Sequence, residues 1–304
     1  MPPRAELHLH LEGSIEPETV CEINPRLTVS QARANYRFTD FRGFIQSYIW
    51  VNNQLTEPVH YAIATRRCLE RLHAHGIRYA EINLSAGVVL WKGQEFGPMF
   101  EAAAAAAAEN SNLEVRWILD AVRQFGPEHG MRVAELAGER AHRGVVGFGI
   151  GGDEARGSAR DFRDVFAFAR SAGLAVLPHA GETVGPDSVW AALECGARRI
   201  GHGFRSIEDP VLVRHLADRQ IPLEICLTSN VRTGAVRSLA EHPVRRLYDA
   251  GVPITLNTDD PAMFETTLAR EFELARDAFG FSETELQEIG ANADRFAVRG
   301  REVC

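Results

Sequence analysis

The sequence lacks any long apolar run. None of its 304 residues falls in a stretch that approaches the roughly 20 consecutive apolar residues of a membrane-spanning helix. Its first residues also lack the apolar core of a signal peptide. We therefore expect a cytoplasmic protein that neither spans nor binds a membrane.

Cysteine and blocks of like charge are scarce as well. The five cysteines are odd in number and widely scattered, which fits reduced thiols better than a disulfide framework or a cysteine zinc site. The formal net charge is −8 without any concentrated patch, so binding to nucleic acid has little electrostatic support. We expect a small-molecule substrate and water as partners, and a homo-oligomer remains possible.

Strand-like apolar runs alternate with helix-like segments along the whole chain. With 45% hydrophobic residues and no linker or change of composition, we expect one α/β domain over residues 1–304, a (β/α)₈ TIM barrel. After a first run that begins at Glu6, the predicted strands are 77–85, 113–122, 145–152, 174–179, 197–202, 222–227 and 252–257. The predicted helices begin near 16–18 and cover 41–75, the alanine-rich 102–108 and 128–143, with irregular structure at 24–40 and a loop at 91–92.

The first run alternates two histidines with leucines. Alternate residues of a strand point to the same face, so His8 and His10 can project together while Leu7, Leu9 and Leu11 pack behind them. Two imidazoles at this spacing can bind one metal ion. The same alternation is also typical of an ordinary half-buried strand, so this pattern alone leaves both interpretations open.

Polar residues recur at the carboxyl ends of the predicted strands, where barrel enzymes place their active sites. They are His8 and His10, Gly152 to Glu154, His179 and Glu182, His202, Ser229 and Asn230, and Asp259 and Asp260. Seven other histidines have no strand end beside them, and we interpret them as surface or packing residues: His60, His73, His75, His129, His142, His215 and His242. We expect changes at His215 and His242 to be close to silent.

Three imidazoles and one carboxylate can meet at this end of the barrel: His8, His10, His179 and Asp259. Such a set suits zinc, with one further position open to water, whose pKa the metal would lower towards 7. Glu182 and His202 are the candidates to donate, accept or orient protons nearby.

One metal ion per chain is the expectation. Barrel hydrolases with two metals usually bridge them through a modified lysine at the end of the fourth strand. Here that strand ends in Gly151 and Gly152, and Lys92 is the only lysine in the sequence.

The motifs in this order resemble the adenosine/adenine deaminase branch of the amidohydrolase superfamily, from about Arg4 to about Phe296. They are HLHLEG at 8–13, PHAGE at 178–182, RIGHG at 199–203, TSN at 228–230 and NTDDP at 257–261. The resemblance implies a zinc barrel that replaces the exocyclic 6-amino group of a purine with oxygen and releases ammonia.

The resemblance also implies roles for single residues. The four metal-binding candidates become the zinc ligands. Glu182 becomes the acid that protonates a ring nitrogen, and His202 orients the attacking hydroxide. Asp260 becomes the partner of ring N7, and the backbone of Gly152 the donor to N3.

The prediction of the substrate rests on positions where this sequence departs from the adenosine-specific members of the family. Glu12 stands where adenosine-specific members usually have Asp, and this resembles adenine deaminases or the deaminases of 6-amino-6-deoxyfutalosine, a menaquinone intermediate that carries a benzoate. Trp91 and Arg123 lie on segments similar to those of the latter, and could supply an aromatic wall and a cation for that carboxylate. We therefore expect aminodeoxyfutalosine to be the best substrate, with adenosine or adenine as the alternatives.

Two other classes of function remain. A metal hydrolase of esters, lactams or phosphotriesters could use the same barrel, but it has less need of an acid placed like Glu182, three residues after His179. A non-catalytic interaction protein on a retained barrel is disfavoured because every candidate site residue is present.

Overall fold

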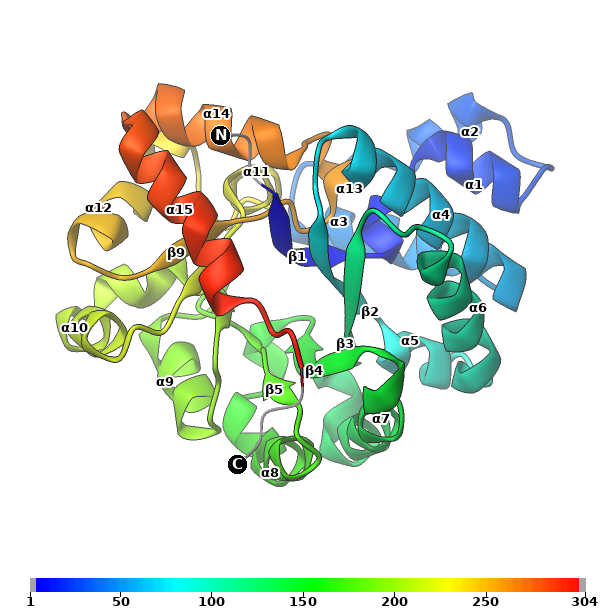
Figure 1. Ribbon diagram of the computed structural model, residues 1–304, viewed down its shortest axis with the longest axis horizontal. Helices are drawn as coiled ribbons and strands as arrows, with labels where there is room; N and C mark the ends of the chain where they lie inside the picture. The colour runs from blue at the N-terminus through cyan, green and yellow to red at the C-terminus, as the bar shows by residue number, and fades with distance from the viewer. Residues whose placement is uncertain (1–3, 301–304) are drawn as a thin grey trace.

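The strands of the protein lie at its centre, surrounded by helices, in a computed structural model that describes residues 4–300 (Figure 1). All strand pairs between these residues are parallel, and they form two sheets with the orders β1-β2-β3-β4-β5 and β6-β7-β8-β9. The strands are β1 Ala5–His10, β2 Tyr79–Leu84, β3 Glu114–Val122, β4 Val145–Gly151, β5 Ala175–Val176, β6 His179–Ala180, β7 Ile200–His202, β8 Leu223–Ile225 and β9 Ile254–Leu256.

β5 and β6 are the two halves of the predicted fifth strand. They are separated at Pro178, which has no N–H to donate to a neighbouring strand. Hydrogen bonds nevertheless continue across the interruption, because Leu177 N–H donates to Phe148 O (3.0 Å) and Gly201 N–H donates to Pro178 O (3.0 Å). The two sheets are therefore connected on this side.

The first and last strands are connected on the other side. His10 N–H donates to Asp259 O (2.8 Å), and Asp259 N–H donates to His8 O (3.0 Å). The eight predicted strand positions thus form the (β/α)₈ barrel expected from the sequence. Since the strands are parallel, their carboxyl ends lie together at one mouth.

The helices form the outer layer of the barrel (Figure 1). The α-helices are α1 Pro17–Ile23, α2 Val29–Ala34, α3 Phe41–Asn52, α4 Pro58–Ala74, α5 Ala86–Trp91, α6 Phe96–Ala108, α7 Gly126–Glu139, α8 Arg163–Ser171, α9 Pro186–Glu194, α10 Pro210–Arg219, α11 Leu227–Arg232, α12 Val244–Asp249, α13 Pro261–Phe264, α14 Leu268–Phe279 and α15 Glu283–Phe296. Short 3-10 turns are η1 Glu12–Ser14, η2 Arg123–Phe125, η3 Ala141–Arg143, η4 Glu154–Arg156, η5 Ala159–Phe162, η6 Phe204–Glu208 and η7 Leu239–Glu241.

Three helix predictions need correction. The segment 24–40 is not wholly irregular, because Thr28 and Gln31 form a reciprocal capping box that starts α2. The helix expected over 41–75 is two helices, and the second begins at Pro58, which is favourable in the first turn of a helix. The loop expected around Trp91 is the short helix α5, which ends at that residue.

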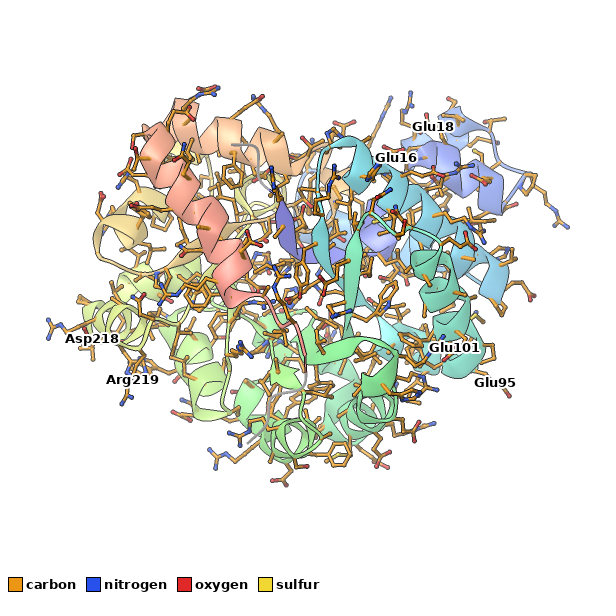
Figure 2. All side chains as sticks on the ribbon, in the orientation of Figure 1. Glu16, Glu18, Glu95, Glu101, Asp218 and Arg219 are labelled. Atoms are coloured by element: carbon orange, nitrogen blue, oxygen red, sulfur yellow. The ribbon has the colours of Figure 1, made fainter. Side chains whose placement is uncertain are left out.

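The core is apolar, and charged side chains project outward at the periphery (Figure 2). Glu95, Asp218 and Arg219 are examples of such exposed residues. Among residues 4–300, no helix combines the length and the apolar character needed to cross a bilayer. The four cysteines in this range are unpaired, and Cys304 lies outside the described residues.

Candidate active site

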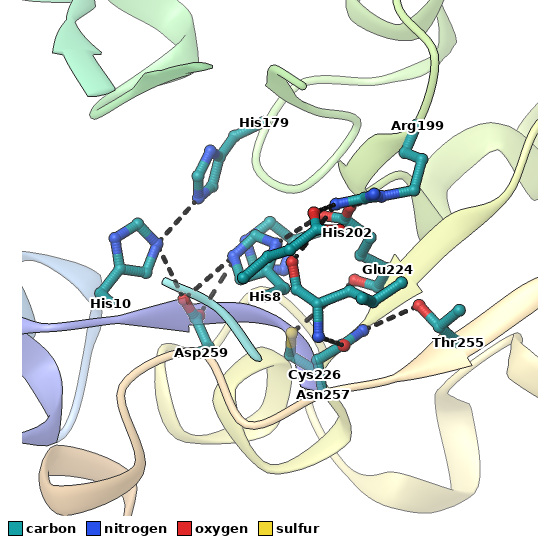
Figure 3. A network of polar contacts seen from close by, with 12 residues as sticks. His8, His10, His179, Arg199, His202, Glu224, Cys226, Thr255, Asn257 and Asp259 are labelled. Carbon is teal, nitrogen blue, oxygen red and sulfur yellow. Dashed lines mark hydrogen bonds and ion pairs between the residues drawn. The ribbon is translucent and has the colours of Figure 1, made fainter. Parts of the chain in front are cut away.

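Four side chains from distant parts of the sequence converge at the mouth of the barrel (Figure 3). They are His8 and His10 of β1, His179 of β6 and Asp259, which follows β9; all are buried. One donor atom from each lies within 4.8 Å of the others. His10 Nε2 is 3.2 Å from His179 Nε2, and the Nε2 atoms of His8 and His10 are 3.3 Å and 3.4 Å from Asp259 Oδ1.

Glu224 on β8 orients the first of these imidazoles. Its Oε2 is 2.7 Å from His8 Nδ1, and His8 Nε2 has no hydrogen-bond partner. Burial alone would raise the pKa of Glu224, but Arg199 and His8 outweigh it and lower this pKa to about 2. An anionic Glu224 keeps the proton on Nδ1 and leaves the Nε2 lone pair free for a metal. The buried unpaired nitrogen and the mixed nitrogen and oxygen donors fit a divalent ion.

A buried ion-pair network continues beneath this imidazole. The guanidinium of Arg199 is 2.5 Å from Glu224 Oε1 and 2.5 Å from Glu81 Oε2, and it donates to Phe296 O at 2.9 Å. All three charged side chains are buried. The network therefore links the orientation of His8 to the end of α15.

Glu182 lies beside the four convergent side chains. It follows His179 by three residues, and its Oε2 is 3.8 Å from His202 Nε2. Burial, together with the negative charges of Asp259 and Glu154, raises its pKa well above the ordinary value. This environment favours the protonated form of the carboxyl group, which can act as a proton donor.

His202 ends β7 with a positive φ of 60°, an uncommon backbone conformation for a residue other than glycine. Burial lowers its pKa to about 4, so the ring is neutral near pH 7. The amide nitrogen of Asn230 is 3.1 Å from His202 Nδ1 and donates to it. Nε2 then carries the ring proton and faces Glu182.

The interpretation of His242 needs correction. Its side chain is buried, and its Nε2 donates to Asn230 Oδ1 at 3.1 Å. Asn230 in turn binds His202, so the three side chains form one chain of hydrogen bonds that ends at the site. His215 has no such link; its ring lies 5.0 Å from that of Trp190.

Asp259 and Asp260 differ in their environments although they are adjacent. Asp259 has a φ of 63° and accepts a hydrogen bond from Ser229 Oγ (2.6 Å). Burial and the neighbouring charge of Asp259 raise the pKa of Asp260 well above its usual range. A Cβ on Gly13 would lie 1.7 Å from Asp260 Oδ1, so only glycine at position 13 leaves room for this carboxyl group.

Two further residues predicted to contact substrate follow β1 and β4. Glu12 is buried; its Oε1 accepts from Ser85 N–H (3.0 Å), its Oε2 accepts from Tyr48 OH (3.3 Å), and burial raises its pKa to about 7. Gly152 follows β4 with a φ of +91°, and a Cβ there would lie 2.3 Å from Gln124 Oε1. The positive φ therefore favours glycine at position 152.

Of the aromatic residue and the cation that were predicted to bind a benzoate, only the aromatic residue is exposed. Trp91 is 64% exposed, and its ring stacks on Phe125 with centroids 5.5 Å apart. The prediction for Arg123 is wrong, because its side chain is buried and its guanidinium donates to Gly157 O (2.8 Å) and to His179 O. Arg123 therefore anchors the strand end that carries a candidate ligand and is not a free cation for a carboxylate.

Sequence reasoning gave no role to Glu224 or Asp120, and it placed Glu154 at a strand end without a role. Glu224 interrupts an otherwise apolar strand, which is a recognisable signal because unpaired charges are rarely buried. Asp120 lies on β3 with its Oδ2 3.7 Å from His10 Nδ1. Such contacts join residues that are far apart in the sequence. They depend on tertiary structure and produce no local sequence motif.

Comparison with known proteins agrees with this geometry. The family model for adenosine deaminase matches residues 3–301. An aminodeoxyfutalosine deaminase of Streptomyces coelicolor is 38% identical over 95% of this chain and 78% of its own length, and an adenine deaminase of Rhizobium meliloti is 38% identical over 95% and 92%.

Solved structures show the same relationship. The adenine deaminase of Arthrobacter aurescens superposes with a TM-score of 0.92 at 30% identity, covering 98% of this chain and 94% of that one. An amidohydrolase of Burkholderia ambifaria with bound Zn gives a TM-score of 0.90 at 26% identity, with coverages of 97% and 85%. The chain therefore belongs to the adenosine deaminase family and is a hydrolytic deaminase.

Proposed function

We propose that this enzyme removes the 6-amino group of a purine compound by zinc-dependent hydrolysis and releases ammonia. The observation that carries the proposal is the buried carboxyl group of Glu182, which lies 3.8 Å from His202 Nε2 and beside the four convergent donor side chains. A hydrolase of esters or phosphotriesters has less use for such an acid. One domain over residues 1–304 would hold one ion.

The ligands of that ion would be His8, His10, His179 and Asp259. When bound, zinc supplies positive charge that lowers the pKa of a water molecule and favours its attack at neutral pH. His202 orients the attacking water through its Nε2–H, and Glu182 donates its proton to a ring nitrogen. Protonation makes the adjacent carbon more electrophilic.

The purine edge needs further partners. The carboxyl group of Asp260, whose pKa is raised by burial and by the charge of Asp259, would be the partner of ring N7, and the backbone of Gly152 would donate to N3. These contacts are common to every 6-aminopurine, so they fix the orientation of the base and do not distinguish between substrates. Discrimination therefore depends on the substituent at N9.

We propose aminodeoxyfutalosine as the preferred substrate. The exposed face of Trp91, backed by Phe125, offers an aromatic platform at the mouth of the barrel, where its benzoate would extend. Since Arg123 and Lys92 both donate to backbone carbonyls, stacking contributes more to recognition than a salt bridge does. Relatives named for aminodeoxyfutalosine and for adenine are equally similar in sequence, so kinetics must decide.

The expected order of kcat/KM is aminodeoxyfutalosine, then adenosine, then free adenine. Replacing Trp91 with alanine lowers kcat/KM for aminodeoxyfutalosine by about 10-fold, because an aromatic contact contributes about 0.5–1.5 kcal/mol beyond its buried area. The same change leaves adenine, which lacks the benzoate, nearly unaffected. Side-by-side measurements on the enzyme and this variant test the proposal, and adenine as the best substrate would contradict it.

The hydrogen-bond chain behind His202 leads to a revised prediction. His242→Ala leaves Asn230 without its partner, so the ring of His202 loses its fixed orientation and turnover falls by about 10-fold, comparable to the loss of an outer partner of a metal ligand. His215→Ala is the matched control and keeps normal turnover. Equal kcat in the two variants would show that Asn230 holds His202 without help.

A further inference from the structure

Glu154 is a buried carboxylate that the proposed chemistry does not use. It begins η4, two residues after Gly152, and its side chain is only 6% exposed. Unpaired carboxylates are rarely buried, because burial disfavours the charged form. The structure places an unusual number of donors around this one.

Those donors belong to the loop that carries Glu182. The backbone N–H groups of residues 181–184 all donate to the carboxylate: Gly181 to Oε1 (2.7 Å), and Glu182, Thr183 and Val184 to Oε2 (2.9, 2.6 and 3.0 Å). The hydroxyl of Ser188 also donates to Oε1, at 2.6 Å. One side chain therefore accepts hydrogen bonds from four successive N–H groups of a loop without regular secondary structure.

The charge of Glu154 is consistent with this arrangement. Burial alone would raise its pKa, but the Ser188 hydroxyl, the backbone donors and Arg123 lower it below the ordinary value. The carboxylate is thus anionic, and its negative charge is among the causes that raise the pKa of Glu182. Neither oxygen of Glu154 is left to contact substrate.

We propose that Glu154 is a positioning residue for Glu182: its carboxylate fixes the backbone of loop 181–184 and so holds the acid against the substrate. The inference rests on the proposed role of Glu182. It assigns to Glu154 an effect on kcat and not on substrate binding.

The test begins with Glu154→Gln, which removes the charge and presents an NH₂ group to some of the loop donors. We expect kcat to fall by about 10- to 100-fold, since misplacing a catalytic group by about 1 Å can cost 10². KM should change by less than about threefold, and the metal content should not change. Glu154→Asp keeps the charge on a shorter side chain and should recover part of the lost turnover.

The matched control is Asp187→Asn. Asp187 is an exposed carboxylate at the start of α9, and both of its oxygens accept hydrogen bonds from Arg160. We expect it to behave like the unmodified enzyme. Amide hydrogen exchange at residues 181–184 should be faster in Glu154→Gln and unchanged in Asp187→Asn, because only the former loses the acceptor of these N–H groups.

A double-mutant cycle separates positioning from general destabilisation. If Glu154 acts through Glu182, adding Glu154→Gln to Glu182→Gln causes no further loss of kcat. Losses that multiply would overturn the inference, as would normal kcat in Glu154→Gln. If that variant does not fold, Glu154→Asp takes its place in the same cycle.

The cycle also distinguishes two kinds of failure. Normal turnover in Glu182→Gln would overturn the proposed function and this inference together. A slow Glu182→Gln beside a fully active Glu154→Gln would overturn the inference alone.

Discussion

Glutamine in place of Glu182 lowers turnover by about 10²–10⁴-fold, the usual contribution of general acid–base catalysis. The amide cannot deliver a proton to the purine ring, whereas its size and shape are nearly those of the carboxyl group. The metal content stays at its original level, because Glu182 is not among the four convergent donors. Single-turnover rates and elemental analysis of the same preparation measure both quantities.

The control for this variant is Glu273→Gln, which neutralises a surface carboxylate paired with Arg270. It should have the turnover of the unmodified enzyme. Near-normal turnover in Glu182→Gln would instead mean that another group protonates the ring. In that case Asp260, whose pKa is also raised by burial, becomes the acid to test.

Replacing His8 or Asp259 with alanine removes both the metal and the activity. We expect the enzyme to contain one equivalent of a divalent ion per chain, most favourably zinc, and removal of one of its four donor side chains should weaken binding of the ion. Loss of either side chain also removes the hydrogen-bond partner of a buried polar atom, Glu224 Oε2 after His8→Ala and Ser229 Oγ after Asp259→Ala. Elemental analysis and activity assays on each purified variant test the prediction.

His215→Ala serves as the control, since this histidine lies away from the site and should keep one equivalent of metal. Treatment of the unmodified enzyme with a chelator should abolish activity, and added zinc should restore it. Two equivalents per chain, or full activity in metal-free protein, would refute the one-ion site.

The strand positions and the convergent residues could be predicted because their signals are local. The alternation at His8 and His10 and the polar ends of later strands follow directly from strand geometry and from the placement of barrel active sites. Family resemblance then assigned roles that spacing alone left open, such as that of Glu182.

The errors have physical causes of two kinds. Helix boundaries were misplaced at two local sequence signals, the capping residue Thr28 and the first-turn proline Pro58. The role of Arg123 and the connection of His242 to Asn230 depend instead on which backbone or side-chain atom lies opposite in the folded barrel. Sequence spacing carries no such information.

The bonds that join β1 to Asp259 also bear on the order of events during synthesis. His8 and His10 leave the ribosome long before Asp259 does. Until then the nascent chain has at most the three imidazoles of the site, and the hydrogen bonds between His8, His10 and Asp259 cannot form. Because binding energy at such a site is also folding energy, high-affinity capture of the ion is delayed until the barrel closes. An ion acquired earlier would be held by an incomplete set of ligands and would remain free to exchange, so we expect the choice of metal to be made only after Asp259 has been synthesised.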